Sequence, residues 1–219
     1  MCYSVKTSII SYSLGMAAAI AAFLTKQYIL GMLILFYVQM QLSEAMIWRG
    51  LDTNNQALNK TGTSYGKYLL ATHNIAIGLG ILIAMYMENK TLQPRDFIPL
   101  LIGIIFFIGI LIVYATTTYE DVTYPANRSC FDKSCQNNGN RLQWPFPHSW
   151  YAFSFIISLI FMIIYIKPMS SKIFIGSLFT ITFILSGIIY PASVGSVWCF
   201  VSAILAPLVV IINYYLQMR

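Results

Sequence analysis

The sequence predicts an all-α fold, a polytopic integral membrane protein built as a bundle of seven transmembrane helices. Seven apolar stretches follow one another along the 219 residues, hydrophobic residues make up 58% of the chain, and charged residues make up only 9%. The mean hydropathy is +0.70. A soluble domain of this size needs a more highly charged surface to stay dispersed, so we expect a single membrane domain over residues 1–219.

Each of the seven stretches has the length of a membrane span. A transmembrane helix takes about 20 mostly apolar residues, with a range of roughly 17–25. All seven are apolar around their circumference, as lipid requires. The predicted spans cover residues 8–24, 28–48, 68–87, 97–115, 150–166, 173–190 and 194–216, and long loops occupy residues 49–67 and 116–149.

Polar residues and prolines mark the ends of these spans. Pro99 falls in the first turn of the fourth span, where a missing N–H costs little. Pro207 lies inside the seventh span and predicts a kink there. The boundaries along the chain are Thr25-Lys26-Gln27, Arg49-Gly50, Glu88-Asn89-Lys90, Lys167-Pro168 and Pro191.

The first span carries two pairs of small residues that are four positions apart, Gly15/Ala19 and Ala18/Ala22. Such pairs let the backbones of membrane helices approach closely. We therefore expect the first helix to pack tightly against a neighbour.

Seven passes place the two termini on opposite sides of the membrane. The basic residues divide six to seven between the two sides, so their number does not decide the orientation. Those on the C-terminal side lie in short connections, which favours a cytoplasmic location for that side. Glycosylation sequons begin at Asn59 and Asn127 on the N-terminal side, and a third begins at Asn89 on the other. We expect an extracytoplasmic or lumenal N-terminus and a cytoplasmic C-terminus.

The cysteines bear on the same question. Cys130 and Cys135 lie close together in the loop 116–149 and are candidates for a disulfide, with free thiols as the alternative. A bridge between Cys2 and Cys199 is the second, less favoured pairing. An oxidised pair would place the N-terminal side in an oxidising compartment.

Polar side chains inside the spans concentrate at one end of the predicted bundle. Ionisable groups are costly within a membrane and are therefore candidates for function. Because helix direction alternates, these residues meet on the N-terminal side, whereas the opposite half is nearly pure Leu, Ile, Phe, Val and Met. The sequence thus predicts a polar, aromatic-lined vestibule. Its candidate ligand- or proton-binding residues are Glu44, His73, Gln41, Asn74, Trp48, Arg49, His148 and Trp198.

Glu44 and His73 form the sharpest hypothesis within this vestibule, because a buried carboxyl and a neighbouring imidazole can exchange a proton. The alternative is that Glu44 pairs with Arg49 and that His73 donates to a backbone carbonyl. Tryptophans near these helix ends, Trp48 and Trp198 included, are typical of an interfacial aromatic belt.

Several function classes are excluded. No lysine lies inside a predicted span, so a retinal Schiff base cannot form. Two histidines are too few for a trio of zinc-binding histidines, and we expect no metal and no cofactor. The net charge of +6 includes no basic cluster with interleaved aromatic residues, so nucleic acid is not an expected partner. The expected partner is the lipid bilayer, with a second copy of the chain or another membrane protein as further candidates.

Three short motifs are spread over the chain. They are Met1-Cys2-Tyr3-Ser4, the run Met40-Gln41-Leu42-Ser43-Glu44-Ala45-Met46-Ile47-Trp48, and Gly195-Ser196-Val197-Trp198-Cys199. Together they resemble a family of uncharacterised multi-spanning membrane proteins of giant DNA viruses, protists and bacteria. Bacterial members often begin with Met-Cys-Trp-Ser, and Tyr3 replaces that Trp here. The resemblance implies a viral or cellular membrane and no catalytic residue.

The sequence favours a non-catalytic structural or interaction component of a viral or cellular membrane. The first alternative is a channel, a proton-coupled carrier or a ligand-binding bundle that uses the vestibule. The second is a membrane enzyme acting on lipid or a thiol-redox substrate through Cys2 and Cys199. The nearly apolar midplane and the small number of convergent ionisable groups argue against the alternatives.

Overall fold

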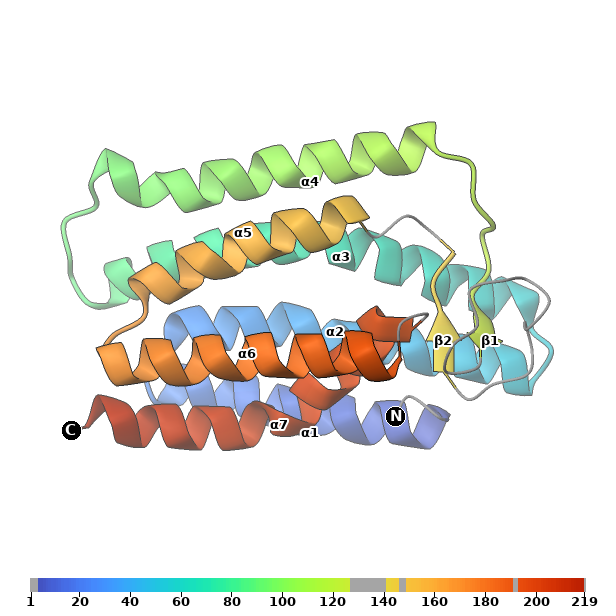
Figure 1. Cartoon of the computed structure of the whole chain (residues 1–219), viewed down its shortest axis with the longest axis horizontal. Coiled ribbons are helices and arrows are strands. Elements are labelled where there is room, and N and C mark those ends of the chain that lie inside the picture. Colours follow the sequence, from blue (N-terminus) through green and yellow to red (C-terminus); the bar gives the residue numbers. More distant parts are fainter. Residues whose placement is uncertain (1–3, 127–140, 146–148, 191–192, 219) are drawn as a thin grey trace.

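The computed structural model describes residues 4–126, 141–145, 149–190 and 193–218. The axes of its seven α-helices are roughly aligned, and successive helices run in opposite directions. The N- and C-terminal ends of the chain lie at opposite ends of the bundle (Figure 1). This arrangement confirms the predicted all-α membrane bundle. We call the end of the bundle nearer the N-terminus the N-terminal end, and the end nearer the C-terminus the C-terminal end.

Apart from the long connection between α4 and α5, the helices are joined by short connections. A 3₁₀ turn, η1 (Pro94–Phe97), precedes α4, and two short antiparallel strands separate α4 from α5. The bounds are α1 Val5–Leu24, α2 Tyr28–Asp52, α3 Gln56–Met87, α4 Ile98–Thr116, β1 Tyr124–Ala126, β2 Arg141–Gln143, α5 Ser149–Tyr165, α6 Met169–Ile189 and α7 Val194–Gln217.

Within the described ranges, six helices are long and apolar enough to cross a membrane. The apolar stretch of α5, Trp150–Tyr165, is shorter than the other six. The outward surfaces are apolar, as lipid contact requires. On α4, for example, Leu101 and Ile105 are each 58% exposed and Ile112 is 57% exposed.

The prediction of a long loop over residues 49–67 is wrong. α2 continues to Asp52 and α3 begins at Gln56, so both helices extend well past their apolar stretches. Local signals explain the tight connection. Asn54 adopts the left-handed conformation that closes α2, with φ 51°, and the Asn55 side chain caps α3 by accepting a hydrogen bond from Leu58 N at 3.1 Å.

The projecting part of α3 holds the segment that follows α4. Asn59 Nδ2 donates to the Thr123 carbonyl at 3.0 Å, and Asn59 Oδ1 accepts from Thr123 N at 3.0 Å. The Asn59 side chain, which begins one of the glycosylation sequons, is therefore buried and both of its polar atoms are hydrogen-bonded. An ion pair of 2.7 Å joins Lys60 to Asp121, and the hydrogen bond from Lys60 lowers the pKa of that carboxyl.

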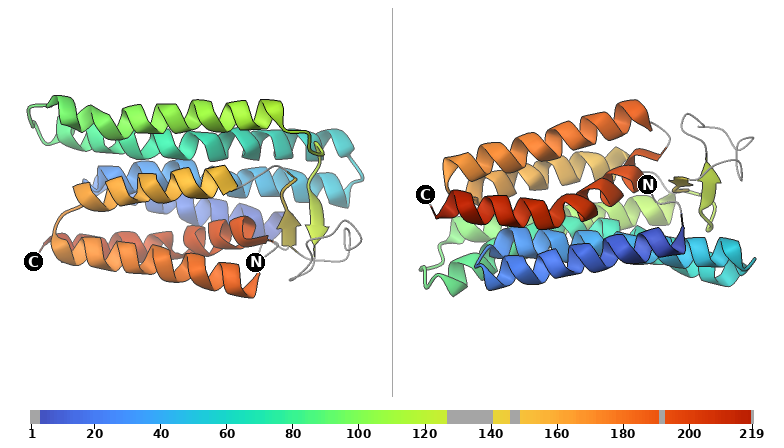
Figure 2. Two further views of the ribbon diagram at one scale, coloured as in Figure 1. Left: turned by 45° about the horizontal axis from the view of Figure 1, so that its top comes forward. Right: turned by 90° about the horizontal axis from the view of Figure 1, so that it is seen from below.

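Helix packing centres on α2, which contacts α1, α3 and α7, while α4 lies along α3 and α6 lies along α7 (Figure 2). The expectation of close packing by the first helix is confirmed. Ala18, Ala19 and Ala22 are all buried, and Gly15 lies directly against Val38 of α2. α7 contains Pro207 and changes direction along its length, as predicted (Figure 1).

Replacing Gly15 by Ala tests the close approach of α1 to α2. The added Cβ would overlap the Val38 side chain, so we expect the free energy of unfolding to fall by about 1–3 kcal/mol. The measurement is thermal unfolding in detergent, followed by circular dichroism. Gly109→Ala is the matched control, because a Cβ there meets nothing within 4 Å. Equal stability of the two variants would contradict the packing.

Candidate functional site

A buried hydrogen-bonded chain links α1 to α2 at the N-terminal end of the bundle. Ser11 Oγ donates to Gln41 Oε1 at 2.7 Å, and Gln41 Nε2 donates to Glu44 Oε2 at 3.3 Å. All three side chains are fully buried. Gln41 and Glu44 are three residues apart, which places both side chains on the same face of α2.

The thiol of Cys199 brings α7 into this group. Cys199 lies near Glu44 and near the Tyr37 hydroxyl. Tyr37 itself donates a hydrogen bond of 2.8 Å to the Trp198 carbonyl. Cys199 is a free, buried cysteine, so it does not form the second, less favoured bridge, whose other member, Cys2, lies outside the described residues. A reactive thiolate needs access and a cationic neighbourhood, whereas Cys199 is buried near a carboxyl group.

The side chains that contact His73 are aromatic, and Glu44 is not among them. Its Nδ1 is 2.9 Å from the Tyr151 hydroxyl of α5. Its ring centroid is 5.9 Å from that of Tyr37 and 5.7 Å from that of Phe155. The predicted Glu44–His73 pair is therefore not a direct one. Tyr37 packs against the His73 ring and also lies near Cys199, which in turn lies near Glu44.

Asn74 serves a structural purpose next to His73. Its Nδ2 donates to Ser154 Oγ at 3.1 Å, and its Oδ1 accepts from Ser158 Oγ at 2.7 Å. These two bonds attach α5 to α3. Asn74 is completely buried, and its amide is satisfied by two residues of one helix face.

The remaining candidates divide between the protein interior and the surface. Trp48 and Trp198 are buried, 7% and 4% exposed, so these two do not form an interfacial belt. Arg49 is exposed while Glu44 is fully buried, and no salt bridge joins them among the described residues. His148, Cys2, Cys130 and Cys135 lie outside the described residues.

An apolar cavity of about 280 Å³ adjoins this polar group and separates α5 from α6 and α7. Its lining contains polar residues, and Phe155, Phe179 and Trp198 supply aromatic surface. The polar residues include Tyr151, Thr180, Ser193 and Cys199. We call it the lateral cavity. The sequence did not identify these phenylalanines as cavity residues, because a phenylalanine in an apolar span has the same sequence context whether it faces lipid, protein or a cavity.

The C-terminal half of the bundle is not purely apolar, contrary to expectation. Gln27 and Asn213 are buried there, and Asn213 Nδ2 donates to Gln27 Oε1 at 2.6 Å. Gln27 Nε2 in turn donates to the Val210 carbonyl at 3.0 Å. The sequence offered one clue to this contact, because each residue is a single amide near the end of an apolar run. Gln27 follows the first span, and Asn213 lies near the end of the seventh.

These features define the class: a helical integral membrane protein with a buried polar group and an adjoining apolar cavity. Comparison of the chain with family models, with curated proteins and with solved structures found no match. The resemblance to multi-spanning viral, protist and bacterial proteins therefore stays a prediction. Within the described residues, no three His, Cys, Asp or Glu side chains converge on a potential metal position.

Asn74→Ala tests the attachment of α5. The variant loses both interhelical hydrogen bonds. Such bonds average about 0.6 kcal/mol each in membrane proteins, so we expect a loss of about 1 kcal/mol of unfolding free energy, measured by thermal unfolding in detergent. Ser13→Ala, which removes a hydroxyl bonded only to the Ile9 carbonyl of its own helix, is the control. A loss no larger than in this control would refute the assignment.

Proposed function

We propose that the protein is a non-catalytic membrane protein that binds an amphipathic small molecule in the lateral cavity. One observation carries the proposal: a cavity of about 280 Å³ lies beside the buried polar group, with apolar walls and a polar edge. Small-molecule sites are typically apolar hollows of about 300–1,000 Å³ with a few placed polar groups. The lateral cavity has this composition, and its volume of about 280 Å³ is slightly below this range.

The lining indicates the chemistry of the ligand. Residues of α5 and α6 present apolar surface, which suits a hydrocarbon chain or ring. The Tyr151 hydroxyl and the Cys199 thiol offer weak, neutral hydrogen-bonding groups at the inner wall. We infer a ligand with a predominantly apolar body and one uncharged polar group, such as a long-chain alcohol.

Access from the membrane phase supports this choice. Ile156 and Ile160 line the cavity and are 47% and 52% exposed, so the cavity reaches the lipid-facing surface of α5. α5 and α6 also pack sparsely against each other. An amphipathic molecule dissolved in the bilayer can therefore enter the lateral cavity directly from the lipid, between α5 and α6. It does not have to pass through the N-terminal end of the bundle.

Gly176→Phe tests the binding site. Gly176 lines the lateral cavity, and a phenylalanine side chain would occupy the space of the ligand. The probe is a dansyl-labelled long-chain alcohol, titrated against detergent-solubilised protein and followed by dansyl fluorescence. We expect saturable binding to the wild type and at least tenfold weaker binding to the variant, or about 1.4 kcal/mol.

Gly109→Phe provides the control, since a Cβ at Gly109 has no neighbour within 4 Å. This variant should bind the probe as the wild type does. Equal affinity of all three proteins, or no saturable binding by the wild type, would exclude the lateral cavity as the site.

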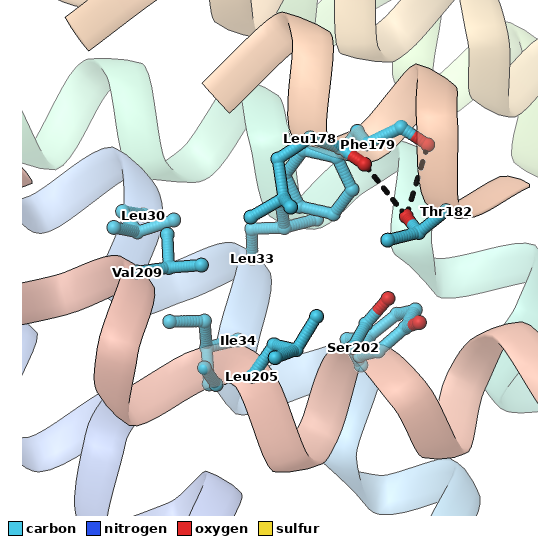
Figure 3. Close-up of a pocket in the computed structure, with 11 residues that line it drawn as sticks. Leu30, Leu33, Ile34, Leu178, Phe179, Thr182, Ser202, Leu205 and Val209 are labelled. Atoms are coloured by element: carbon cyan, nitrogen blue, oxygen red, sulfur yellow. Dashed lines mark hydrogen bonds between the residues drawn. The ribbon is translucent and has the colours of Figure 1, made fainter. Parts of the chain in front are cut away.

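A proton-coupled carrier is the second candidate, because hollows lie in series along the bundle. A small cavity of about 30 Å³ lies between α2, α6 and α7, with Thr182 and Ser202 toward one end and Leu30 and Val209 toward the other (Figure 3). Phe179 lines both this cavity and the lateral cavity. Leu30 lines both this cavity and a larger one at the C-terminal end. In such a carrier, Phe179 would separate the lateral cavity from the small cavity, and Leu30 would separate the small cavity from the one at the C-terminal end.

Proton flux in liposomes tests the carrier. With a pH-sensitive dye inside the vesicles, a proton-coupled carrier gives wild-type flux above that of empty liposomes and a several-fold reduction in Glu44→Gln, which removes a buried carboxyl group. Lys6→Gln, a change at an exposed residue of the same end, should leave the flux unchanged. Flux equal to that of empty liposomes, or unaffected by Glu44→Gln, would exclude proton coupling through this group.

A further inference from the structure

A second large hollow lies at the C-terminal end of the bundle, independent of the proposed ligand site. Its volume is about 550 Å³, and it is enclosed by the α1–α2 turn, the connection from α3 to α4, and the ends of α5 and α7. We call it the basal cavity. It combines exposed charged residues at its mouth with buried amides at its floor.

Cationic side chains surround the mouth of the basal cavity. Lys26, Arg95 and Lys167 come from three separate connections, all are exposed, and none forms a salt bridge within the described part of the chain. The nearby Lys90 is neutralised by an ion pair with Glu88. Three unpaired cations around one hollow create a positive potential that favours an anion.

The lining has two acidic residues, and Asp96, like Glu88, is already engaged. The Asp96 side chain is buried, and its Oδ2 accepts a hydrogen bond of 2.8 Å from Gln93 N, which caps η1. Its Oδ1 accepts from the Tyr165 hydroxyl at 3.4 Å. Asp96 therefore fixes the connection that carries Arg95, and it leaves the positive charge of the mouth in excess.

The floor of the basal cavity contains a polar atom that lacks a partner. Asn213 is 2% exposed, its Nδ2 is bonded to Gln27, and its Oδ1 is buried without a hydrogen bond among the described residues. Leaving a buried amide oxygen unsatisfied costs free energy, so such an atom calls for a donor. A ligand that fits this cavity should thus carry a hydrogen-bond donor as well as a negative charge.

We propose that the basal cavity binds the headgroup of an anionic phospholipid. Lys26, Arg95 and Lys167 hold the phosphodiester through charge-assisted hydrogen bonds. A hydroxyl or ammonium of the headgroup donates to Asn213 Oδ1. Basic pockets between the ends of transmembrane helices are suited to such headgroups.

The lining distinguishes a lipid from a free phosphate ion. Ile164 lines the basal cavity and is 56% exposed on the outer surface of α5. The cavity therefore continues into lipid-facing surface, where the acyl chains of a bound lipid can lie. A free phosphate would make no use of this apolar side.

The experiment measures lipid preference in the full-length protein. Detergent-solubilised protein is titrated with phosphatidylglycerol or phosphatidylcholine of identical acyl chains, and bound lipid is counted by native mass spectrometry. We expect at least tenfold tighter binding of phosphatidylglycerol. The triple variant Lys26→Gln, Arg95→Gln, Lys167→Gln should reduce this preference to within twofold.

A matched triple variant at the other end, Lys6→Gln, Arg49→Gln, Lys60→Gln, removes the same charge and should keep the preference. Lys26→Arg with Lys167→Arg should also keep it, and thermal unfolding midpoints establish that each variant is folded. Equal loss in both triple variants, or no preference in the wild type, would overturn the proposal. Displacement of phosphatidylglycerol by millimolar inorganic phosphate would also overturn it, because the site would then bind a free ion.

Discussion

The buried polar side chains of α2 are the constraint on which the rest of the bundle depends. Tyr37 bonds to the Trp198 carbonyl of α7 at 2.8 Å, Gln41 accepts from Ser11 of α1 at 2.7 Å, and Ser43 donates to the Gly62 carbonyl of α3 at 2.7 Å. A polar group without a partner is costly away from water. Rotation or sliding of α2 would break these bonds together, so they fix the positions of its three neighbours.

The hydrogen-bonded frame continues outward along two separate branches. On one branch, His73 and Asn74 of α3 hold α5. On the other, Trp198 Nε1 of α7 donates to Thr182 of α6 at 3.1 Å. α5 and α6 are thus each attached to a different helix and only weakly to each other. The lateral cavity lies where the two branches diverge, which explains physically why a hollow forms there.

The two ends of the bundle differ in how they meet water. At the N-terminal end, α2 and α3 project past their apolar stretches, and the segment containing Thr123 docks on Asn59. At the C-terminal end the connections are short. α1 is closed by Lys26 in the left-handed conformation, with φ 60°, and Gln27 N donates to the Ala22 carbonyl at 2.8 Å. This turn leaves the Lys26 side chain exposed and the Gln27 side chain buried, so it supplies both the mouth and the floor of the basal cavity.

The sequence alone determined the class of the protein and the course of most of its helices. Apolar length is a local property that lipid imposes on each segment separately, and the small residues of the first span and Pro207 also act locally. The loop over residues 49–67 was mispredicted because hydropathy reports where lipid contact ends, not where a helix ends. The capping pattern at Asn54 and Asn55 decides the latter.

Only the tertiary structure decided which polar residues share a site. A helix that is apolar on all sides has no polar face from which its rotation about its own axis could be predicted. The sequence therefore could not show that His73 faces Tyr151 rather than Glu44. Gln27 and Asn213 are 186 residues apart, yet they bond at 2.6 Å. Trp48 and Trp198 are buried because neighbouring helices cover them. Such contacts depend on the relative rotation of helices, which buried hydrogen bonds and close packing fix only when the whole bundle assembles.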